Sequence, residues 1–208
     1  MIRDWFPVND GLAVAARLSP RALTHRQATA LELVLLILCG AAAATATALI
    51  RLRLGIPGHA IVLSVIPMVV GLALAPRRLA GFIMGASALA TAASLSMSGT
   101  ARFGSGAITS LCLVGPILDL ALARARTGWR LYLGIVSAGI GANLVALGSR
   151  AAAKLLGLDL GGNVRPFDSW WAQATITYTL CGAVAGLIAA VCCFRWREQR
   201  SKQEAAGQ

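Results

Sequence analysis

Apolar residues fill six stretches of this chain, and each is close to the length that a membrane-spanning helix needs. A helix that crosses the hydrocarbon core of a bilayer takes about 20 mostly apolar residues. The second stretch contains Pro67, which can kink a membrane helix without preventing it. The pattern therefore predicts an all-α integral membrane bundle of six transmembrane helices, with approximate bounds 28–50, 58–75, 79–97, 106–124, 129–149 and 170–194.

Polar segments flank and separate these stretches. Residues 1–27 are polar and basic with a weak apolar patch, and they are predicted to form a cytoplasmic segment that lies on the membrane surface as an amphipathic element. The short connection at residues 75–78 predicts a tight turn at the membrane face. The organisation is then an N-terminal segment (1–27), a six-helix transmembrane domain (28–194) and a basic cytoplasmic tail (195–208).

Composition agrees with a membrane location. Hydrophobic residues make up 57% of the chain and charged residues 13%, whereas a soluble domain has about 25% charged residues. The net charge of +11 is carried between the apolar stretches, so we interpret it as a topology signal and expect no nucleic-acid partner. The five cysteines form no CxxC pair and no zinc-ligand spacing, and they are predicted to be small buried hydrophobes.

The placement of arginine and lysine predicts the orientation. An even number of spans puts both termini on one side of the membrane. If that side is the cytoplasm, 13 of the 19 Lys and Arg residues lie inside, as the positive-inside rule requires. Both termini are therefore predicted to be cytoplasmic in a multi-pass protein of the bacterial inner membrane. The segment GIPGHA at 55–60 and the long loop at 150–169 then face outside.

Two acidic residues fall within the predicted spans. Ionisable residues inside a membrane are costly and are functional candidates by default. Glu32 lies near the start of the first span, where it is expected to reach Arg26 or the headgroups. Asp119 lies about one turn before Arg124, so a local ion pair at the inner face is expected. Neither position is deep enough to favour a proton relay.

Polar and aromatic residues gather at the outer ends of three spans. Binding pockets are mostly apolar with a few convergent polar groups. Three of these residues, spaced i, i+3 and i+7, share one face of the last span. The alternative is an aromatic belt at the interface with polar contacts between helices. The predicted outward-opening pocket for a small solute is lined by His59, Asn143, Trp170, Gln173 and Thr177.

Small residues recur at intervals of four in the first span, at Gly40, Ala44 and Ala48. Such a surface lets helices approach closely. It predicts a docking site for another membrane subunit, with packing inside this chain as the alternative.

No catalytic pattern is present in the sequence. It has no G-x-S-x-G, no H-E-x-x-H and no phosphate-binding P-loop motif. We therefore predict that the protein is not an enzyme. If ATP drives its activity, a separate subunit must bind the nucleotide.

Short motifs between residues 54 and 125 add a resemblance. Their order and approximate spacing resemble those of the substrate-binding S-components of energy-coupling-factor transporters, a class of ABC importer, and are closest to the cobalt/nickel branch. The motifs are Gly58-His59, Leu74-Ala75-Pro76, Phe103-Gly104-Ser105-Gly106-Ala107-Ile108-Thr109 and Leu113-Val114-Gly115-Pro116.

The resemblance implies a function. Such a subunit captures a solute outside and works with a membrane coupling subunit and cytoplasmic ATPases. His59 would be the metal ligand, with nickel or cobalt as the substrate and no resident cofactor. The chain has Ile2 where metal-binding members have a histidine, so a vitamin-like molecule stays open as the solute. The alternatives are a non-transporting accessory or assembly subunit of a larger membrane complex and, third, a lipid-modifying enzyme that uses Glu32 or Asp119.

Overall fold

The computed structural model describes residues 25–50, 61–75, 79–123, 125, 128–156 and 167–195. These residues form six α-helices and no strand, which confirms the all-α prediction for this part of the chain. The helices are α2 (His25–Leu49), α3 (Ile61–Leu74), α4 (Ala80–Met97), α5 (Ser105–Leu122), α6 (Gly128–Leu155) and α7 (Phe167–Ala190), and a π-helical turn (Val191–Arg195) continues α7.

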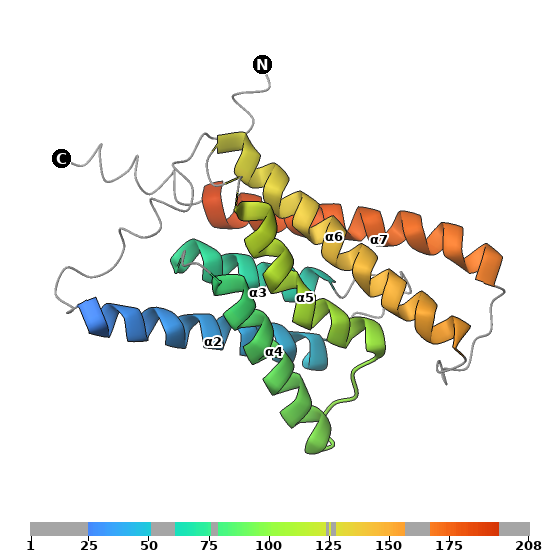
Figure 1. The fold of residues 1–208 in the computed structure, drawn as a ribbon, viewed down its shortest axis with the longest axis horizontal. Coiled ribbons are helices and arrows are strands. Elements are labelled where there is room, and N and C mark those ends of the chain that lie inside the picture. Colours follow the sequence, from blue (N-terminus) through green and yellow to red (C-terminus); the bar gives the residue numbers. More distant parts are fainter. Residues whose placement is uncertain are drawn as a thin grey trace.

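Consecutive helices alternate in direction, as Figure 1 shows. Four of them have stretches long and apolar enough to cross a membrane: Ala30–Leu49, Ala80–Met97, Gly128–Leu155 and Trp170–Phe194. The other two apolar helices are shorter. At about 1.5 Å per residue, the 14 residues of α3 cover only about 21 Å, less than the thickness of a hydrocarbon core of about 30 Å. The described helices fit a membrane-embedded protein with transmembrane helices.

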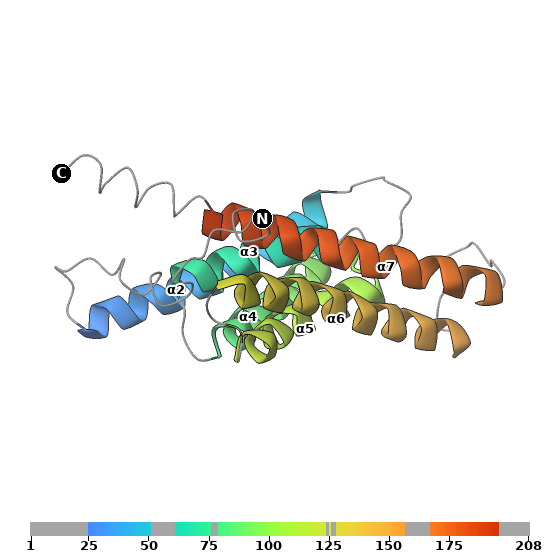
Figure 2. The ribbon, with the colours of Figure 1, turned by 90° about the horizontal axis from the view of Figure 1, so that it is seen from above.

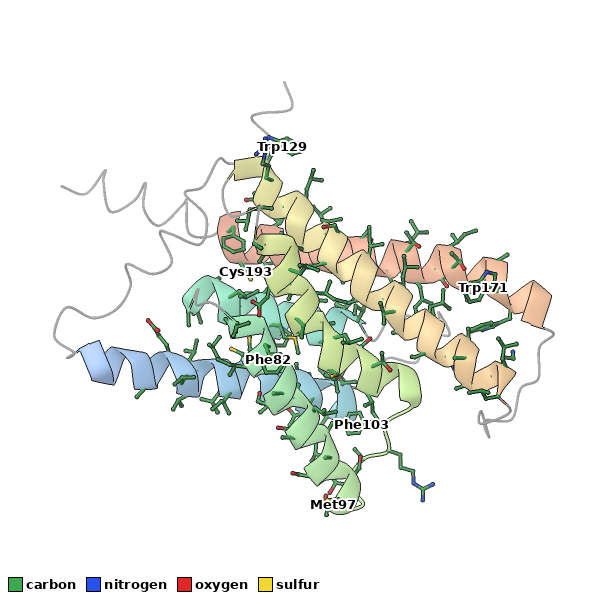
Figure 3. The ribbon with its side chains drawn as sticks, in the orientation of Figure 1. Phe82, Met97, Phe103, Trp129, Trp171 and Cys193 are labelled. Atoms are coloured by element: carbon green, nitrogen blue, oxygen red, sulfur yellow. The ribbon has the colours of Figure 1, made fainter. Side chains whose placement is uncertain are left out.

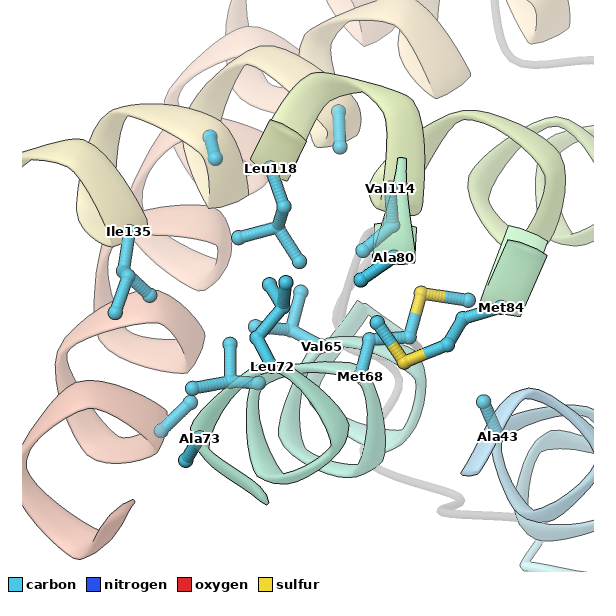
Figure 4. Packing of buried hydrophobic residues seen from close by; sticks show 14 of the residues in the cluster. Ala43, Val65, Met68, Leu72, Ala73, Ala80, Met84, Val114, Leu118 and Ile135 are labelled. Carbon is cyan, nitrogen blue, oxygen red and sulfur yellow. The ribbon is translucent and has the colours of Figure 1, made fainter. Parts of the chain in front are cut away.

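The shortest helix is the centre of the fold. α3 contacts each of the other five helices, and α4 and α5 lie on one side of it in the view of Figure 2. Its Val65, Met68 and Leu72 are buried against side chains of α4 and α5 (Figure 4). A helix that is apolar on all sides is expected to be buried in this way. α3 therefore fills the middle of the bundle, where its length need not match the bilayer.

Glycines set the crossing of α4 with α5. A Cβ at Gly115 would collide with the carbonyl oxygen of Gly81, and a Cβ at Gly81 would collide with that of Gly115. One turn on, a Cβ at Gly85 would lie 2.8 Å from the Cys112 carbonyl oxygen. That carbonyl has lost its usual helical donor, because Pro116 has no N–H. The two backbones are therefore in direct contact, as in small-xxx-small crossings of membrane helices.

A second glycine crossing joins α6 to α7. A Cβ at Gly139 would lie 2.5 Å from the Gly182 carbonyl oxygen, and a Cβ at Gly182 would lie 2.6 Å from that of Gly139. Gly186 lies one turn further along α7, where a Cβ would come within 2.7 Å of the Val136 Cα. This close approach determines which side chains of the two helices meet beyond the crossing.

Large apolar side chains point away from the bundle. On α7, Ile176, Leu180, Val184 and Leu187 follow a helical spacing, and all four are exposed. A soluble protein seldom exposes a contiguous apolar stripe of this kind, whereas a lipid-facing helix requires it. Small residues on the inward side of the same helix are buried, among them Ala174, Ala185 and Ala189.

Candidate functional site

Asn143 joins α6 to α7 within the bundle. Its side chain is only 1% exposed, and its Nδ2 donates a hydrogen bond of 2.7 Å to the backbone carbonyl oxygen of Tyr178. A buried amide needs such a partner, because leaving it unpaired in an apolar environment costs free energy. The predicted site residue Asn143 thus has a role in helix–helix contact, which is the alternative that the sequence left open.

The hydroxyl of Tyr178 continues this link toward the end of α6. Tyr178 is 4% exposed, and its Oη accepts a hydrogen bond of 3.4 Å from Nη1 of Arg150. Arg150 itself is exposed. One side of its guanidinium is therefore held against a buried residue while the side chain reaches the surface of the bundle.

One turn further along α6, Lys154 meets an aromatic ring of α7. The Lys154 Nζ lies 4.9 Å from the centroid of the Trp170 ring, a cation–π distance. Trp170 packs on a small buried cluster that includes Ala146, Leu147 and Ala174. Its own neighbour Trp171 is tilted by 54° with the ring centroids 6.3 Å apart. Lys154 and the two tryptophans therefore form a connected group at this end of the α6–α7 pair, one helical turn beyond Arg150.

Tryptophans mark both ends of the α6–α7 pair. Figure 3 shows Trp129 at one end and Trp171 at the other. Trp129 and Arg150 are separated along α6 by about 31 Å, which matches a hydrocarbon core of about 30 Å. Tryptophan and arginine both favour the headgroup level. Arg150, Lys154 and Trp170 are therefore expected at the depth of the lipid headgroups.

The other two predicted residues on α7 have different environments. Gln173 is exposed. Thr177 is half-buried, and its hydroxyl lies 3.0 Å from the backbone carbonyl oxygens of Gln173 and Ala174, so it bonds within its own helix. Asn143 and Trp170 thus belong to one contact region, while the hydroxyl of Thr177 is used locally. Their role in solute binding stays a prediction.

His59, the predicted metal ligand, lies outside the described residues, as does the segment GIPGHA. Among the residues that are described, no group of three or more His, Cys, Asp or Glu side chains is placed to hold a metal ion. The assignment of nickel or cobalt as substrate stays a prediction.

The predicted docking residues of α2 lie partly inside the bundle. A Cβ at Gly40 would collide with the Ser87 hydroxyl and the Met84 carbonyl oxygen of α4. Ala44 is fully buried, whereas Ala48 is half-buried. Gly40 therefore serves packing between α2 and α4, and Ala44 is buried within the bundle, which is the alternative left open above; docking of a second subunit stays a prediction.

Asp119 has a role that the sequence did not predict. Its Oδ1 accepts a hydrogen bond of 3.0 Å from the Gly81 N–H, and its Oδ2 accepts one of 2.9 Å from the Phe82 N–H. The carboxylate therefore caps the N-terminus of α4 from α5. The expected partner Arg124 lies outside the described residues.

Arg150 and Lys154 fall in the predicted loop at 150–169, because the predicted span ends at residue 149. The helix continues to Leu155, which places both cations on α6, four residues apart. A signal was present in the sequence: residues 150–156 contain no glycine or proline that would end a helix.

Comparison with known protein families, curated proteins and solved structures finds no match to this chain.

Proposed function

We propose that this chain is the substrate-binding membrane subunit of an energy-coupling-factor type importer, which captures a small solute from the outer side. The main support is a chain of polar and aromatic contacts that runs from the middle of the α6–α7 pair to one end: Asn143 bonds to Tyr178, Tyr178 bonds to Arg150, and Trp170 packs on the buried cluster that contains Tyr178. The alternating helices and the motif resemblance around Gly115 also support it.

The partners follow from the proposal. An importer subunit of this type needs a membrane coupling subunit and a pair of cytoplasmic ATPases. The test is purification of the tagged full chain from its native host in a mild detergent, followed by mass spectrometry of the co-purifying proteins. Stoichiometric recovery of an ATPase pair with a membrane coupling protein is the expected result. Recovery of a different stable complex without an ATPase would contradict the proposal.

The solute class is tested at His59. If a transition-metal ion is the solute, His59→Ala should abolish binding of nickel by the purified protein, because imidazole is the preferred protein ligand among those available in GIPGHA. Equilibrium dialysis with nickel alone measures this directly. His25→Ala is the matched control, since it removes the only other histidine of the chain. Equal nickel binding by the His59→Ala variant and the parent would exclude His59 as a ligand.

An accessory subunit of a larger membrane complex is the second candidate. It is favoured by the second half of α4, whose Ala90, Ala93 and Ser94 are exposed. Met97 at the tip of this helix is 89% exposed and lies away from the other helices in Figure 3. Small and hydroxyl-bearing residues are typical of contacts between membrane helices. The same co-purification distinguishes this candidate by the identity of the partner.

A further inference from the structure

Arg150 and Lys154 form a pair of cations on one face of α6. They are four residues apart, which places them one above the other on a helix. Both meet α7, Arg150 through the Tyr178 hydroxyl at 3.4 Å and Lys154 through the Trp170 ring at 4.9 Å. Trp170 and Tyr178 are themselves eight residues apart on α7. Two cations of one helix therefore face two aromatic residues of its antiparallel neighbour.

The contacts on α7 hold these cations in place. Tyr178 is buried, and its backbone carbonyl is bonded to the buried side chain of Asn143, so the hydroxyl that contacts Arg150 is fixed. A guanidinium has five N–H donors in a rigid fork, of which a single hydroxyl engages only a part. Trp170 is held by the cluster around Ala146 and Leu147. Ordered cations lose less entropy on binding a ligand than mobile surface ones do.

The negative end of the helix dipole attracts cations, and this alone would explain why the last turn of α6 carries a basic residue. It would not explain why Arg150 contacts a buried tyrosine or why Lys154 lies over a tryptophan ring. Two cations a turn apart suit an oxygen-bearing anion, because a guanidinium recognises phosphate and carboxylate with paired hydrogen bonds. The same charges repel a divalent metal ion.

We propose that Arg150 and Lys154, positioned by Tyr178 and Trp170, bind a phosphate or carboxylate group at the end of the α6–α7 pair. At headgroup depth this group comes either from an anionic phospholipid or from a soluble oxyanion. The site does not depend on the importer function proposed above. If the ligand is soluble, it identifies the solute class as anionic.

The test uses the purified full-length chain and two probes. Inorganic phosphate is titrated by calorimetry into the protein in phosphatidylcholine nanodiscs, and phosphatidylglycerol is compared with phosphatidylcholine by native mass spectrometry in detergent. At least one anionic probe should bind the parent. Loss of a hydrogen bond to a charged group should make Arg150→Gln weaken that binding by about tenfold or more. Lys154→Gln should weaken it as well.

Arg102→Gln is the matched control, because Arg102 is an exposed cation in the connection between α4 and α5. It should leave binding of the anionic probe unchanged.

If Arg150→Gln does not fold, Tyr178→Phe tests the same site, since it removes only the hydroxyl that orients the guanidinium. This variant should bind the anionic probe more weakly while it keeps the helix content of the parent. Phosphate binding identifies a soluble ligand, and binding of phosphatidylglycerol alone identifies a lipid site. The proposal would be overturned if neither probe bound the parent, or if Arg150→Gln and Arg102→Gln lost the same amount of anion binding. Either result would hold independently of the co-purification that tests the importer function.

Discussion

Asp119 supplies a cap that the start of α4 lacks. The residue before the helix, Leu79, has a left-handed backbone (φ 61°) and no side-chain acceptor. The first N–H groups of a helix have no partner within the helix. Asp119 reaches them from α5 and also places a negative charge at the positive end of the helix dipole. One carboxylate thus connects two helices and satisfies two backbone donors.

Replacing this carboxylate should destabilise the protein. Asp119→Ala leaves the N–H groups of Gly81 and Phe82 without their acceptor. Gly81 is buried, and a buried donor left unpaired costs about 1–3 kcal/mol. Asp119→Asn keeps an amide oxygen for one donor and should lie between the parent and Asp119→Ala. Thermal unfolding in detergent measures both. The capping role would be wrong if Asp119→Ala unfolded at the same temperature as the parent.

Substitution of Asn143 distinguishes a role in linking α6 to α7 from a role in contacting a ligand. Asn143→Ala removes the hydrogen bond to the Tyr178 carbonyl, and side-chain hydrogen bonds between membrane helices are worth about 0.6–2 kcal/mol. A loss of stability in this range is expected by denaturant titration in micelles. Gln173→Ala is the control for stability, because Gln173 is exposed on α7 and its replacement should leave the free energy of unfolding unchanged. Unchanged stability of Asn143→Ala, together with lost solute binding, would favour the predicted pocket instead.

At the scale of the helices, glycines at the crossings decide how closely α4 and α5 pack. Gly115→Ala introduces a Cβ where the Gly81 carbonyl oxygen already lies, so the helices must separate. Gly148→Ala on α6 is the matched control, since a Cβ there meets nothing within 4 Å. Alanine is the better helix former by about 1 kcal/mol.

The two substitutions should therefore have opposite effects on the unfolding temperature in detergent. Gly115→Ala is expected to lower it, and Gly148→Ala to leave it unchanged or raise it slightly. A Gly115→Ala variant at least as stable as the parent would show that the backbones are not in contact at this crossing.

The sequence predicts the helices better than it predicts their contacts. All six described helices fall within a few residues of the predicted stretches, except that α6 runs to Leu155, because apolar runs of membrane length are a strong local signal. The sequence gives no sign that Gly81 and Gly182 lie at helix crossings, and Gly115 enters only as part of a motif, since a glycine in an alanine-rich helix does not indicate which helix it meets. The carboxylate of Asp119 was assigned to a neighbour in sequence, whereas its partners are 37 and 38 residues away.

The same limit applies to the candidate site. Helical periodicity correctly places Trp170, Gln173 and Thr177 on one helix, but it does not indicate that Thr177 bonds within that helix or that Tyr178 faces Asn143. Arg150 was missed because a charged residue usually ends a predicted span. Arg150 lies on α6, at the depth where lipid headgroups are expected and its charge would be tolerated.

For the whole molecule, one arrangement accounts for these observations. A short apolar helix, α3, fills the centre, and longer helices around it expose apolar side chains such as Ile176 and Leu180. In a bilayer, the polar end of α6–α7 is then expected at one membrane surface, and Trp129 with Arg130 at the other. Capture of a solute from outside requires that the end with Arg150 faces outward.

The orientation of α6–α7 can be measured from the accessibility of single cysteines, placed in a variant whose five native cysteines are replaced by serine. Arg150→Cys, Arg102→Cys and Arg130→Cys are each exposed to a membrane-impermeant maleimide in spheroplasts of a bacterial expression host. Capture from the outer side predicts labelling of Arg150→Cys and Arg102→Cys without lysis, and of Arg130→Cys only after lysis. Labelling of Arg130→Cys from outside, with Arg150→Cys protected until lysis, would place the polar end of α6–α7 in the cytoplasm and contradict capture from the outer side.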